Sequence, residues 1–236
     1  MFAILAAPAL ASTAELVGLF GGFPCKYDPS TCVPPPPDTA LVYLGGGEAN
    51  RVSVTADARQ VRISDPAAQI VPGPGCSRVD DHNVSCSMPN VLVYVATGAG
   101  RDTVRSELGS QTKLTVDGGT GDDVLVGGPG PDALLGGRGA DRLRGRDGTD
   151  LLFDSSSVGP LRAGDLSPTA GGGGVFFPAP RDPGRGRDSF DGGSGNDTVS
   201  YEGRREKLRI DLASRRPIAG ARGERDSIRR VENAIG

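Results

Sequence analysis

A nine-residue period runs through the middle of this chain and limits what the chain can fold into. From Gly118 the sequence divides into four units in register, GGTGDDVLV, GGPGPDALL, GGRGADRLR and GRDGTDLLF. A fixed period of this kind predicts a stacked architecture in which every unit repeats one turn and one short strand. Glycine recurs at positions one and four, as Gly118, Gly121, Gly127, Gly130, Gly136, Gly139, Gly145 and Gly148, and aspartate at position six, as Asp123, Asp132, Asp141 and Asp150.

A second block resumes the pattern after an interruption. The units PGRGRDSFD and GGSGNDTVS begin at residue 183 and place Asp188 and Asp197 at position six, and TGAGRDTVR is a degenerate copy that carries Asp102. Residues 154–182 do not fit the period, and the two blocks are not separated by a multiple of nine residues. We therefore expect residues 154–182 to be an insertion loop.

The residue types in each unit predict a calcium-binding turn. Glycine is needed where a tight turn takes a positive φ and directs its carbonyl groups inward, because a side chain there would clash. The aspartate at position six adds a short carboxylate to these carbonyl oxygens. Ca²⁺ binds six to eight hard oxygen ligands of this kind, whereas transition metals prefer the imidazole or thiolate ligands that the repeats lack.

The units resemble the hemolysin-type calcium-binding repeat of the RTX proteins, GGxGxDxUx, over residues 118–153 and 183–200. The wider layout is similar to that of secreted actinobacterial calcium-binding proteins, in which a disulfide-bearing β region precedes the repeats. The resemblance implies an all-β fold containing a parallel β-roll, with two units per turn and Ca²⁺ between loops one full turn apart. The implied ligand pairs are Asp123 with Asp141 and Asp132 with Asp150, with a weaker site near Asp188 and Asp197.

Two features qualify the implied sites. Arg146 replaces the second glycine of the fourth unit, which should weaken the site there. A turn-capping role without metal is the alternative for the aspartates.

Residues 117–154 carry eight aspartates, no glutamate and four arginines. Because cation binding would relieve the repulsion among these aspartates, we expect the calcium-free repeats to be poorly ordered.

The rest of the chain also favours strands. With 37 glycines, 19 prolines, no tryptophan and 36% hydrophobic residues, it has little material for a large conventional core. Short β-branched alternations predict strands at 41–44, 52–54, 61–63, 91–95, 103–104 and 208–212. We divide the chain into a signal-like leader (1–14), a Pro-rich spacer (15–38), a β-strand region with a disulfide (39–117), the RTX repeats (118–153), the insertion loop (154–182), and a second repeat block with a basic C-terminal β segment (183–236).

The leader and the cysteines indicate a secreted, extracellular protein. Residues 1–14 carry no charged side chain and end in small residues, which is typical of a signal peptide, and the apolar stretch is too short to span a membrane. The four cysteines, Cys25, Cys32, Cys76 and Cys86, allow three disulfide pairings. We favour pairing of neighbours because each such pair closes a short turn-rich loop. A zinc site is the competitor, but the spacing is wrong and the chain has a single histidine.

Two functions remain open at this point. The first is a calcium-binding structural or interaction module that is not an enzyme and whose partner is a protein or a cell surface. The second is an extracellular, carbohydrate-active hydrolase with its site on the 39–117 β region. HExxH and Gly-x-Ser-x-Gly motifs are absent, and the lack of tryptophan disfavours a sugar-stacking cleft. No basic run is interleaved with aromatic residues, so nucleic-acid binding is not expected.

Strand alternation predicts two unlike outer faces for the repeats, because positions seven and nine flank the inward leucine. Units one and three would present valines and arginines, and units two and four would present an apolar face. We hypothesise that the insertion, which contains Val175, Phe176 and Phe177, folds back over this apolar face. The apolar face consists of Ala133, Leu135, Leu151 and Phe153.

Overall fold

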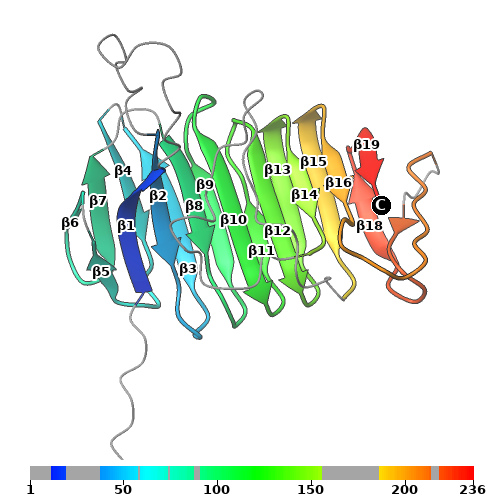
Figure 1. The fold of residues 1–236 in the computed structure, drawn as a ribbon, viewed down its shortest axis with the longest axis horizontal. Helices are drawn as coiled ribbons and strands as arrows, with labels where there is room; N and C mark the ends of the chain where they lie inside the picture. Colours follow the sequence, from blue (N-terminus) through cyan, green and yellow to red (C-terminus); the bar gives the residue numbers. More distant parts are fainter. Residues whose placement is uncertain are drawn as a thin grey trace, which may run out of the picture.

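The chain folds into two long β-sheets that lie face to face along an elongated molecule (Figure 1). The computed structural model describes residues 12–19, 38–57, 59–73, 75–87, 91–155, 186–213 and 218–236. These residues contain no helix, so the predicted all-β class is confirmed. Accordingly, no helix in these ranges is long and apolar enough to cross a membrane.

Sheet A is nine-stranded, with the order β19-β16-β14-β12-β10-β8-β2-β1-β5. Its strands are β1 (Ser12–Leu19), β2 (Asp38–Leu44), β5 (Ile70–Pro72), β8 (Val91–Ala96), β10 (Lys113–Thr120), β12 (Asp132–Arg138), β14 (Leu151–Phe153), β16 (Thr198–Ser200) and β19 (Asn233–Ile235).

Sheet B is ten-stranded, with the order β17-β18-β15-β13-β11-β9-β3-β4-β7-β6. Its strands are β3 (Arg51–Ala56), β4 (Gln60–Ser64), β6 (Cys76–Arg78), β7 (Asn83–Ser87), β9 (Thr103–Glu107), β11 (Val124–Val126), β13 (Arg142–Gly148), β15 (Ser189–Gly195), β17 (Ile218–Ala219) and β18 (Asp226–Arg229).

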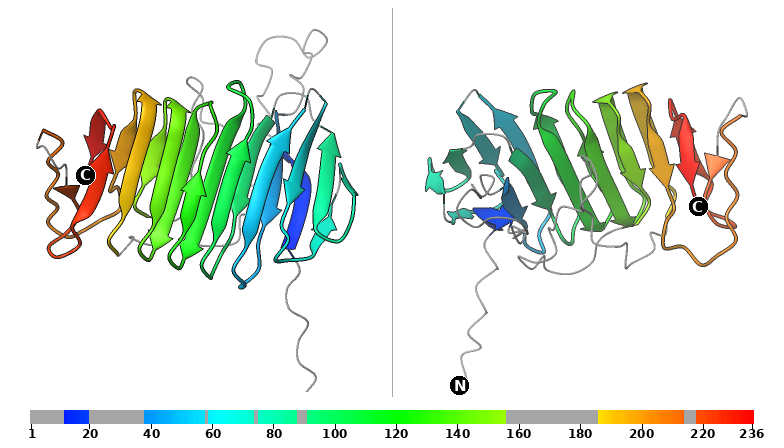
Figure 2. Two further views of the ribbon diagram at one scale, coloured as in Figure 1. Left: turned by 180° about the vertical axis from the view of Figure 1, so that it is seen from behind. Right: turned by 45° about the horizontal axis from the view of Figure 1, so that its top comes forward.

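From β8 to β16 the strands alternate between the two sheets, and each pairs in parallel with the next strand of its own sheet. Equivalent repeat positions are therefore in register, as in the pairs Leu125 with Leu143 and Leu134 with Leu152. Figure 2 shows this regular succession of strands from behind and from a tilted view. Antiparallel strands are confined to the two ends, where β1, β4, β6, β7 and β17 flank the parallel series.

The position-eight side chains form the core between the sheets. Leu125, Leu134, Leu143 and Leu152 are each at most 1% exposed and belong to one hydrophobic cluster. Their burial follows from the period: position eight is the inward residue of the strand part of every unit, so parallel stacking places these leucines in rows. The observed strands β12, β13 and β15 are longer than the three residues expected, because they continue into the first positions of the next unit.

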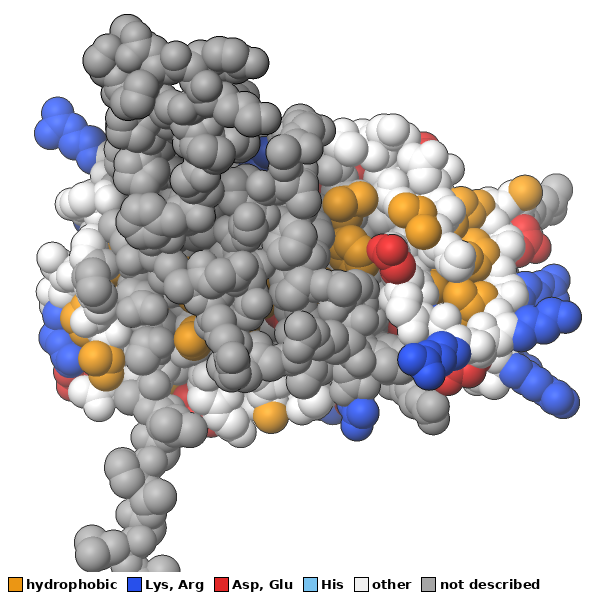
Figure 3. Space-filling model, in the orientation of Figure 1, with side chains coloured by type: hydrophobic (Ala, Val, Ile, Leu, Met, Phe, Trp, Pro, Cys, Tyr) orange, Lys and Arg blue, Asp and Glu red, His pale blue; other side chains and the backbone are white. Residues whose placement is uncertain are grey.

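Sheet A has the apolar outer face that the alternation predicts. Ala133 and Leu135 are 1% exposed and Phe153 is 8% exposed, so this face is buried. On sheet B the matching positions Arg142 and Arg144 are exposed. Figure 3 shows further hydrophobic side chains toward the C-terminal end of the visible face. The hypothesis that the insertion covers the apolar face concerns residues 175–177, which lie outside the described ranges, and it stays a prediction.

The insertion starts and ends inside one turn of the repeat. Phe153 pairs with Leu135 on the neighbouring strand. The residue after Phe153, Asp154, therefore corresponds to Gly136, which is position one of a unit. Gly139, at position four of its unit, lies against the carbonyl oxygen of Gly121 in the preceding turn. Gly186 lies in the same way against the carbonyl oxygen of Gly139, so Gly186 occupies position four. The turn between β14 and β15 therefore keeps the first and last parts of a unit, and the added residues enter between them.

Several predicted boundaries differ from the observed strands. Residues 12–19 form β1, so the division between leader and spacer at 14/15 falls inside a strand, and the division at 117/118 falls inside β10. The strand predicted at 208–212 is wrong, because Leu208 and Asp211 form isolated bridges there. Conversely, β18 and β19 pair in parallel with the second repeat block, so the tail adds strands that we did not expect.

The disulfide between Cys76 and Cys86 is present and joins paired residues of β6 and β7. The predicted partners Cys25 and Cys32 lie outside the described residues. The turn between β6 and β7 carries His82, which is exposed and contacts the Ala68 carbonyl through Nδ1 at 2.8 Å. The histidine thus serves as part of a surface turn in the structure.

Candidate metal centre

The carboxylates of successive turns are connected by hydrogen bonds from the backbone. The N–H of Asp123 donates to Oδ1 of Asp141, and the N–H of Asp141 donates to Oδ1 of Asp188, each at 2.8 Å. The same bond recurs along the edge that leads into the strands of sheet B, with lengths of 2.7–2.9 Å. We call this series the first ladder; it comprises Asn50, Asp102, Asp123, Asp141, Asp188 and Asp226 in that order.

A second ladder runs along the opposite edge, which leads into the strands of sheet A. Asp132 donates its N–H to Oδ1 of Asp150, and Asp150 donates to Oδ1 of Asp197, both at 2.9 Å. Asp197 donates in turn to Oε2 of Glu232 at 2.8 Å. The structure therefore brings together both aspartate pairs that the resemblance implies, Asp123 with Asp141 and Asp132 with Asp150.

Each ladder bond uses one carboxylate oxygen, and for six of the accepting aspartates the other oxygen has no donor among the described residues. The unpaired atoms are buried Oδ2 oxygens, and their side chains are at most 2% exposed. An unpaired buried carboxylate oxygen is costly, and each one calls for a cation or a proton. The oxygens without a donor belong to Asp102, Asp123, Asp141, Asp150, Asp188 and Asp197.

Backbone carbonyls lie beside these carboxylate oxygens. A Cβ built on Gly118 would be 2.5 Å from Asp123 Oδ2 and 2.9 Å from the Gly136 carbonyl oxygen, so both oxygens border the same space. Gly145 has the same surroundings, formed by Asp150 Oδ2 and the Gly192 carbonyl. Glycine at position one thus leaves room for a carboxylate and a carbonyl from adjacent turns to converge. This is the donor set that Ca²⁺ prefers.

Glycine at position four serves the stacking of the turns. Gly121 and Gly139 both have φ of 138°, a conformation that side chains rarely adopt. A Cβ on Gly139 would collide with the carbonyl oxygen of Gly121 in the preceding turn. Substitution at this position would therefore separate the turns whose oxygens converge.

Burial raises the pKa of the ladder carboxyls. The pKa of Asp123, Asp132, Asp141 and Asp150 rises to about 7 in each case, mainly because burial penalises the charged form. Backbone N–H donors oppose the rise, and neighbouring carboxylates add to it, as Asp141 does at Asp123. Without a bound cation, the ladders are therefore partly protonated near neutral pH.

The start of the second ladder differs from the other turns. Asp132 Oδ2 accepts a hydrogen bond from the Gly128 N–H at 2.6 Å, so this oxygen already has a donor within its own unit. The loop of this unit packs against the Leu108 carbonyl, in a turn that is not a repeat. We therefore expect Asp132 to be a poorer cation ligand than Asp150 or Asp197.

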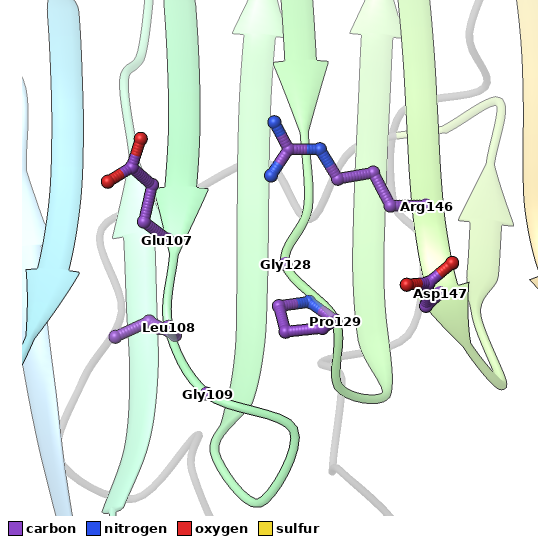
Figure 4. Close-up of a pocket in the computed structure, with 7 residues that line it drawn as sticks. All are labelled: Glu107, Leu108, Gly109, Gly128, Pro129, Arg146 and Asp147. Atoms are coloured by element: carbon purple, nitrogen blue, oxygen red, sulfur yellow. The ribbon is translucent and has the colours of Figure 1, made fainter.

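Arg146 lies close to this irregular turn. Its φ is 87°, in the left-handed region that disfavours a side chain, and its Nη1 donates to the Ser106 carbonyl at 3.1 Å. In Figure 4 the guanidinium extends from β13 toward the unit that carries Gly128, away from the carboxylate of Asp147. The sequence predicted that Arg146 would disturb the fourth unit, and this strained backbone gives a physical cause. The open pocket here is lined by Glu107, Leu108, Gly109, Gly128, Pro129, Arg146 and Asp147.

Four ladder residues are not among the site residues that the sequence predicts: Asn50, Asp102, Asp226 and Glu232. Of these, only Asp102 lies in a unit that we identified as a degenerate repeat. Asn50 lies in GGGEANRVS, which keeps the glycines at positions one and two and the apolar residue at position eight. This partial pattern was the available signal; near Asp226 and Glu232 the surviving glycines are too few to reveal the period.

Parallel strands separated by glycine turns that hold buried, unpaired carboxylates define a metal-binding repeat protein. Residues 117–152 and 184–203 match the family model of the RTX calcium-binding nonapeptide repeat in 4 copies. These residues are therefore RTX-type calcium-binding repeats, and the resemblance seen in this part of the sequence is confirmed. No curated protein and no solved structure matches the chain. The family match leaves out Asn50, Asp102, Asp226 and Glu232.

The raised pKa values predict opposite pH responses with and without calcium. In chelator, the folded carboxyls hold protons between about pH 4 and pH 7 that the unfolded chain has released, so stability falls as the pH rises through this window. Calcium must displace these protons, so its affinity rises through the same window. The β-sheet circular dichroism in chelator and calorimetric titration with calcium, both at pH 5, 6, 7 and 8, measure the two trends. Trends with the same sign would contradict this assignment.

Proposed function

We propose that this protein is a secreted calcium-binding β-roll whose folding depends on calcium and which serves as a structural or interaction module. The observation that carries the proposal is the set of buried Oδ2 oxygens without donors, placed next to backbone carbonyls of the adjacent turn. A purely turn-capping role accounts for the Oδ1 atoms but leaves these Oδ2 atoms unexplained. Calcium, when bound, supplies the charge that they lack.

The best-formed sites lie where a position-six Oδ2 without a donor borders a carbonyl oxygen of the next turn. On the first ladder this is the pair Asp123 and Asp141, as the resemblance implies. On the second ladder we assign the stronger site to Asp150 and Asp197, because Asp132 already accepts a hydrogen bond from its own loop. Asp102 extends the first ladder toward the N-terminus with a further unpaired Oδ2.

Calcium dependence of folding follows from the charges in the two ladders. Every turn adds a buried carboxylate directly beside the carboxylate of the preceding turn, and the core leucines can stack only when these turns are in register. Ionised carboxylates in that arrangement repel one another and lose their hydration. Bound calcium offsets both terms, so its binding free energy contributes to folding.

We propose that the module acts by binding and not by catalysis. The alternative hydrolase would need paired carboxylates on the β region from 39 to 117. Asp65, a buried aspartate of this region outside the repeat-like turns, accepts hydrogen bonds from Tyr43 Oη, Asn50 Nδ2 and two backbone N–H groups. A carboxylate with four donors is a poor general base or nucleophile, and this supports the binding role.

Export remains part of the proposal, and β1 narrows where a leader would be removed. Ser12 and Ala14 are fully buried, and Thr13 pairs with Leu44 while Ser12 pairs with Ile70. Cleavage after Ala14 would delete these contacts, whereas cleavage after Ala11 would retain the whole strand. The disulfide between Cys76 and Cys86 also suits an oxidising compartment.

Calcium titration tests the proposed function. We expect the chelated protein to show weak β-sheet circular dichroism and calcium to produce a cooperative gain, with a matching rise in the calorimetric unfolding temperature. Magnesium at the same concentration should produce a much smaller gain, because it demands a strict octahedron and retains water. Identical spectra and unfolding temperatures in calcium and in chelator would refute the proposal.

Exchanging one ladder carboxylate for an amide separates ligation from hydrogen bonding. Asp141→Asn keeps an Oδ1 acceptor for the Asp123 N–H but replaces the unpaired Oδ2. We expect a loss of calcium affinity of about tenfold or more, equal to about 1.4 kcal/mol, with no loss of stability in chelator. Asp147→Asn is the control, because Asp147 is exposed and lies in the same repeat block. Equal calcium affinities for the two variants would show that Asp141 does not bind the ion.

The N-terminus of exported protein provides a separate test of localisation. We expect secretion in an oxidising host to yield a mature chain that begins at Ser12, because β1 is then intact. N-terminal sequencing and peptide mapping measure the cleavage position and the linkage of Cys76 to Cys86. Retention of the leader on secreted protein, or free thiols at both cysteines, would overturn this prediction.

A further inference from the structure

Three buried aspartates from distant parts of the sequence meet at the C-terminal end of the first ladder. Asp154 follows β14, Asp188 precedes β15, and Asp226 begins β18. Their side chains are at most 2% exposed, and one carboxylate oxygen of each lies within 4.8 Å of the others. Asp154 and Asp226 lie outside the residues that match the RTX repeat.

The donors around this cluster satisfy two of the aspartates but not the third. Arg204 binds Asp154 through Nε and Nη2, at 2.6 and 2.9 Å. Asp226 accepts hydrogen bonds from the Asp188 N–H and from Tyr201 Oη, at 2.9 and 3.0 Å. Asp188 Oδ1 accepts from the preceding turn, but Asp188 Oδ2 has no donor among the described residues. The Asp188 carboxyl also lies within hydrogen-bonding reach of the Asp154 carboxyl, a contact in which neither group can donate unless one of them is protonated.

The charges in the cluster do not balance. Arg204 supplies one positive charge, and it also binds Glu224 at 2.9 Å. Tyr201 contributes a neutral hydroxyl to Asp226. The formal charges of Asp188 and Asp226 are thus left without a cation among the described contacts. Two uncompensated negative charges at this depth would be strongly destabilising.

We propose that Asp154, Asp188 and Asp226 form a further divalent-cation site, selective for calcium-like ions, at this end of the molecule. Oxygens bound to one Ca²⁺ at about 2.3–2.6 Å lie no more than about 5 Å apart, and the cluster meets this limit. In the repeat turns a glycine at position one leaves room beside the carboxylate. Here Asp154 occupies position one and brings a second carboxylate to the site.

The site would link both flanks of the insertion to strand β18. Asp154 precedes residues 156–185 and Asp188 follows them, while Asp226 is the first residue of β18. A cation shared by these residues fixes the interrupted turn in the same register as an uninterrupted one. The inference rests on the proposed calcium function for the identity of the ion, but two of its three ligands, Asp154 and Asp226, lie outside the residues that match the repeat.

Tyr201 offers a spectroscopic probe of this site. The chain has no tryptophan, and the Tyr201 hydroxyl donates to the ligand Asp226, so a Tb³⁺ ion bound here would receive energy from the Tyr201 ring. We expect excitation of tyrosine to give Tb³⁺ luminescence that calcium abolishes. Tyr201→Phe should lose most of this emission. Tyr43→Phe is the matched control, because Tyr43 also donates to a buried aspartate but at the opposite end.

Counting bound ions tests the same site without tyrosine. Asp226→Asn keeps the Oδ1 acceptor for the Asp188 N–H and leaves the Arg204 ion pair intact. By native mass spectrometry at saturating calcium, we expect this variant to carry one calcium ion fewer than the unmodified chain. An unchanged ion count, together with unchanged Tb³⁺ emission in Tyr201→Phe, would overturn the site and leave a shared proton as the explanation of the cluster.

The two proposals fail in distinguishable ways. If calcium changes neither the circular dichroism nor the unfolding temperature of the unmodified chain, the calcium-dependent fold is wrong. If calcium changes both, but Asp226→Asn binds as many ions as the unmodified chain, the repeat sites stand and the cluster does not bind a cation.

Discussion

The hydrogen bond from the N–H of one position-six residue to the carboxylate of the next turn is the interaction on which this structure depends. It fixes the spacing of the turns, and through them the register of the short strands. It also brings the aspartate side chains into the interior, where six of them keep one carboxylate oxygen without a donor among the described residues. The bond that orders the turns therefore creates the need for a cation, and structure and ligand binding have the same origin.

The composition of the repeat follows from this bond. Position one must be small because the unpaired oxygen of the same unit lies beside it, as at Gly118 and Asp123. Position four must accept a positive φ and a close carbonyl, as at Gly139. With the turns constrained in this way, positions seven to nine of each unit lie in a strand. One inward leucine per unit then suffices to fill the space between the sheets.

The sequence allowed prediction of those parts of the fold and site that repeat without change. The resemblance to a repeat with two units per turn implied the pairs Asp123 with Asp141 and Asp132 with Asp150, and both pairs are hydrogen-bonded. Glu232 was not recognised because a longer carboxylate in a poorly matching unit performs the same role. The strand nature of residues 12–19 was hidden for another reason, because an uncharged run of small and apolar residues has the composition of a leader as well as that of a buried strand.

The two ends of the first ladder solve one electrostatic problem in different ways. At the N-terminal end the ladder stops at Asn50, an amide without charge, and the nearby Asp65 has donors from Tyr43, Asn50 and two backbone groups. At the C-terminal end the ladder stops at Asp226, beside two further carboxylates and one arginine. The carboxylate of Asp65 at the N-terminal end thus has a full set of donors, whereas at the C-terminal end Asp188 keeps an oxygen without a donor beside two further carboxylates. This contrast between the ends, within one series of identical bonds, is the reason to place an additional cation at the C-terminal end.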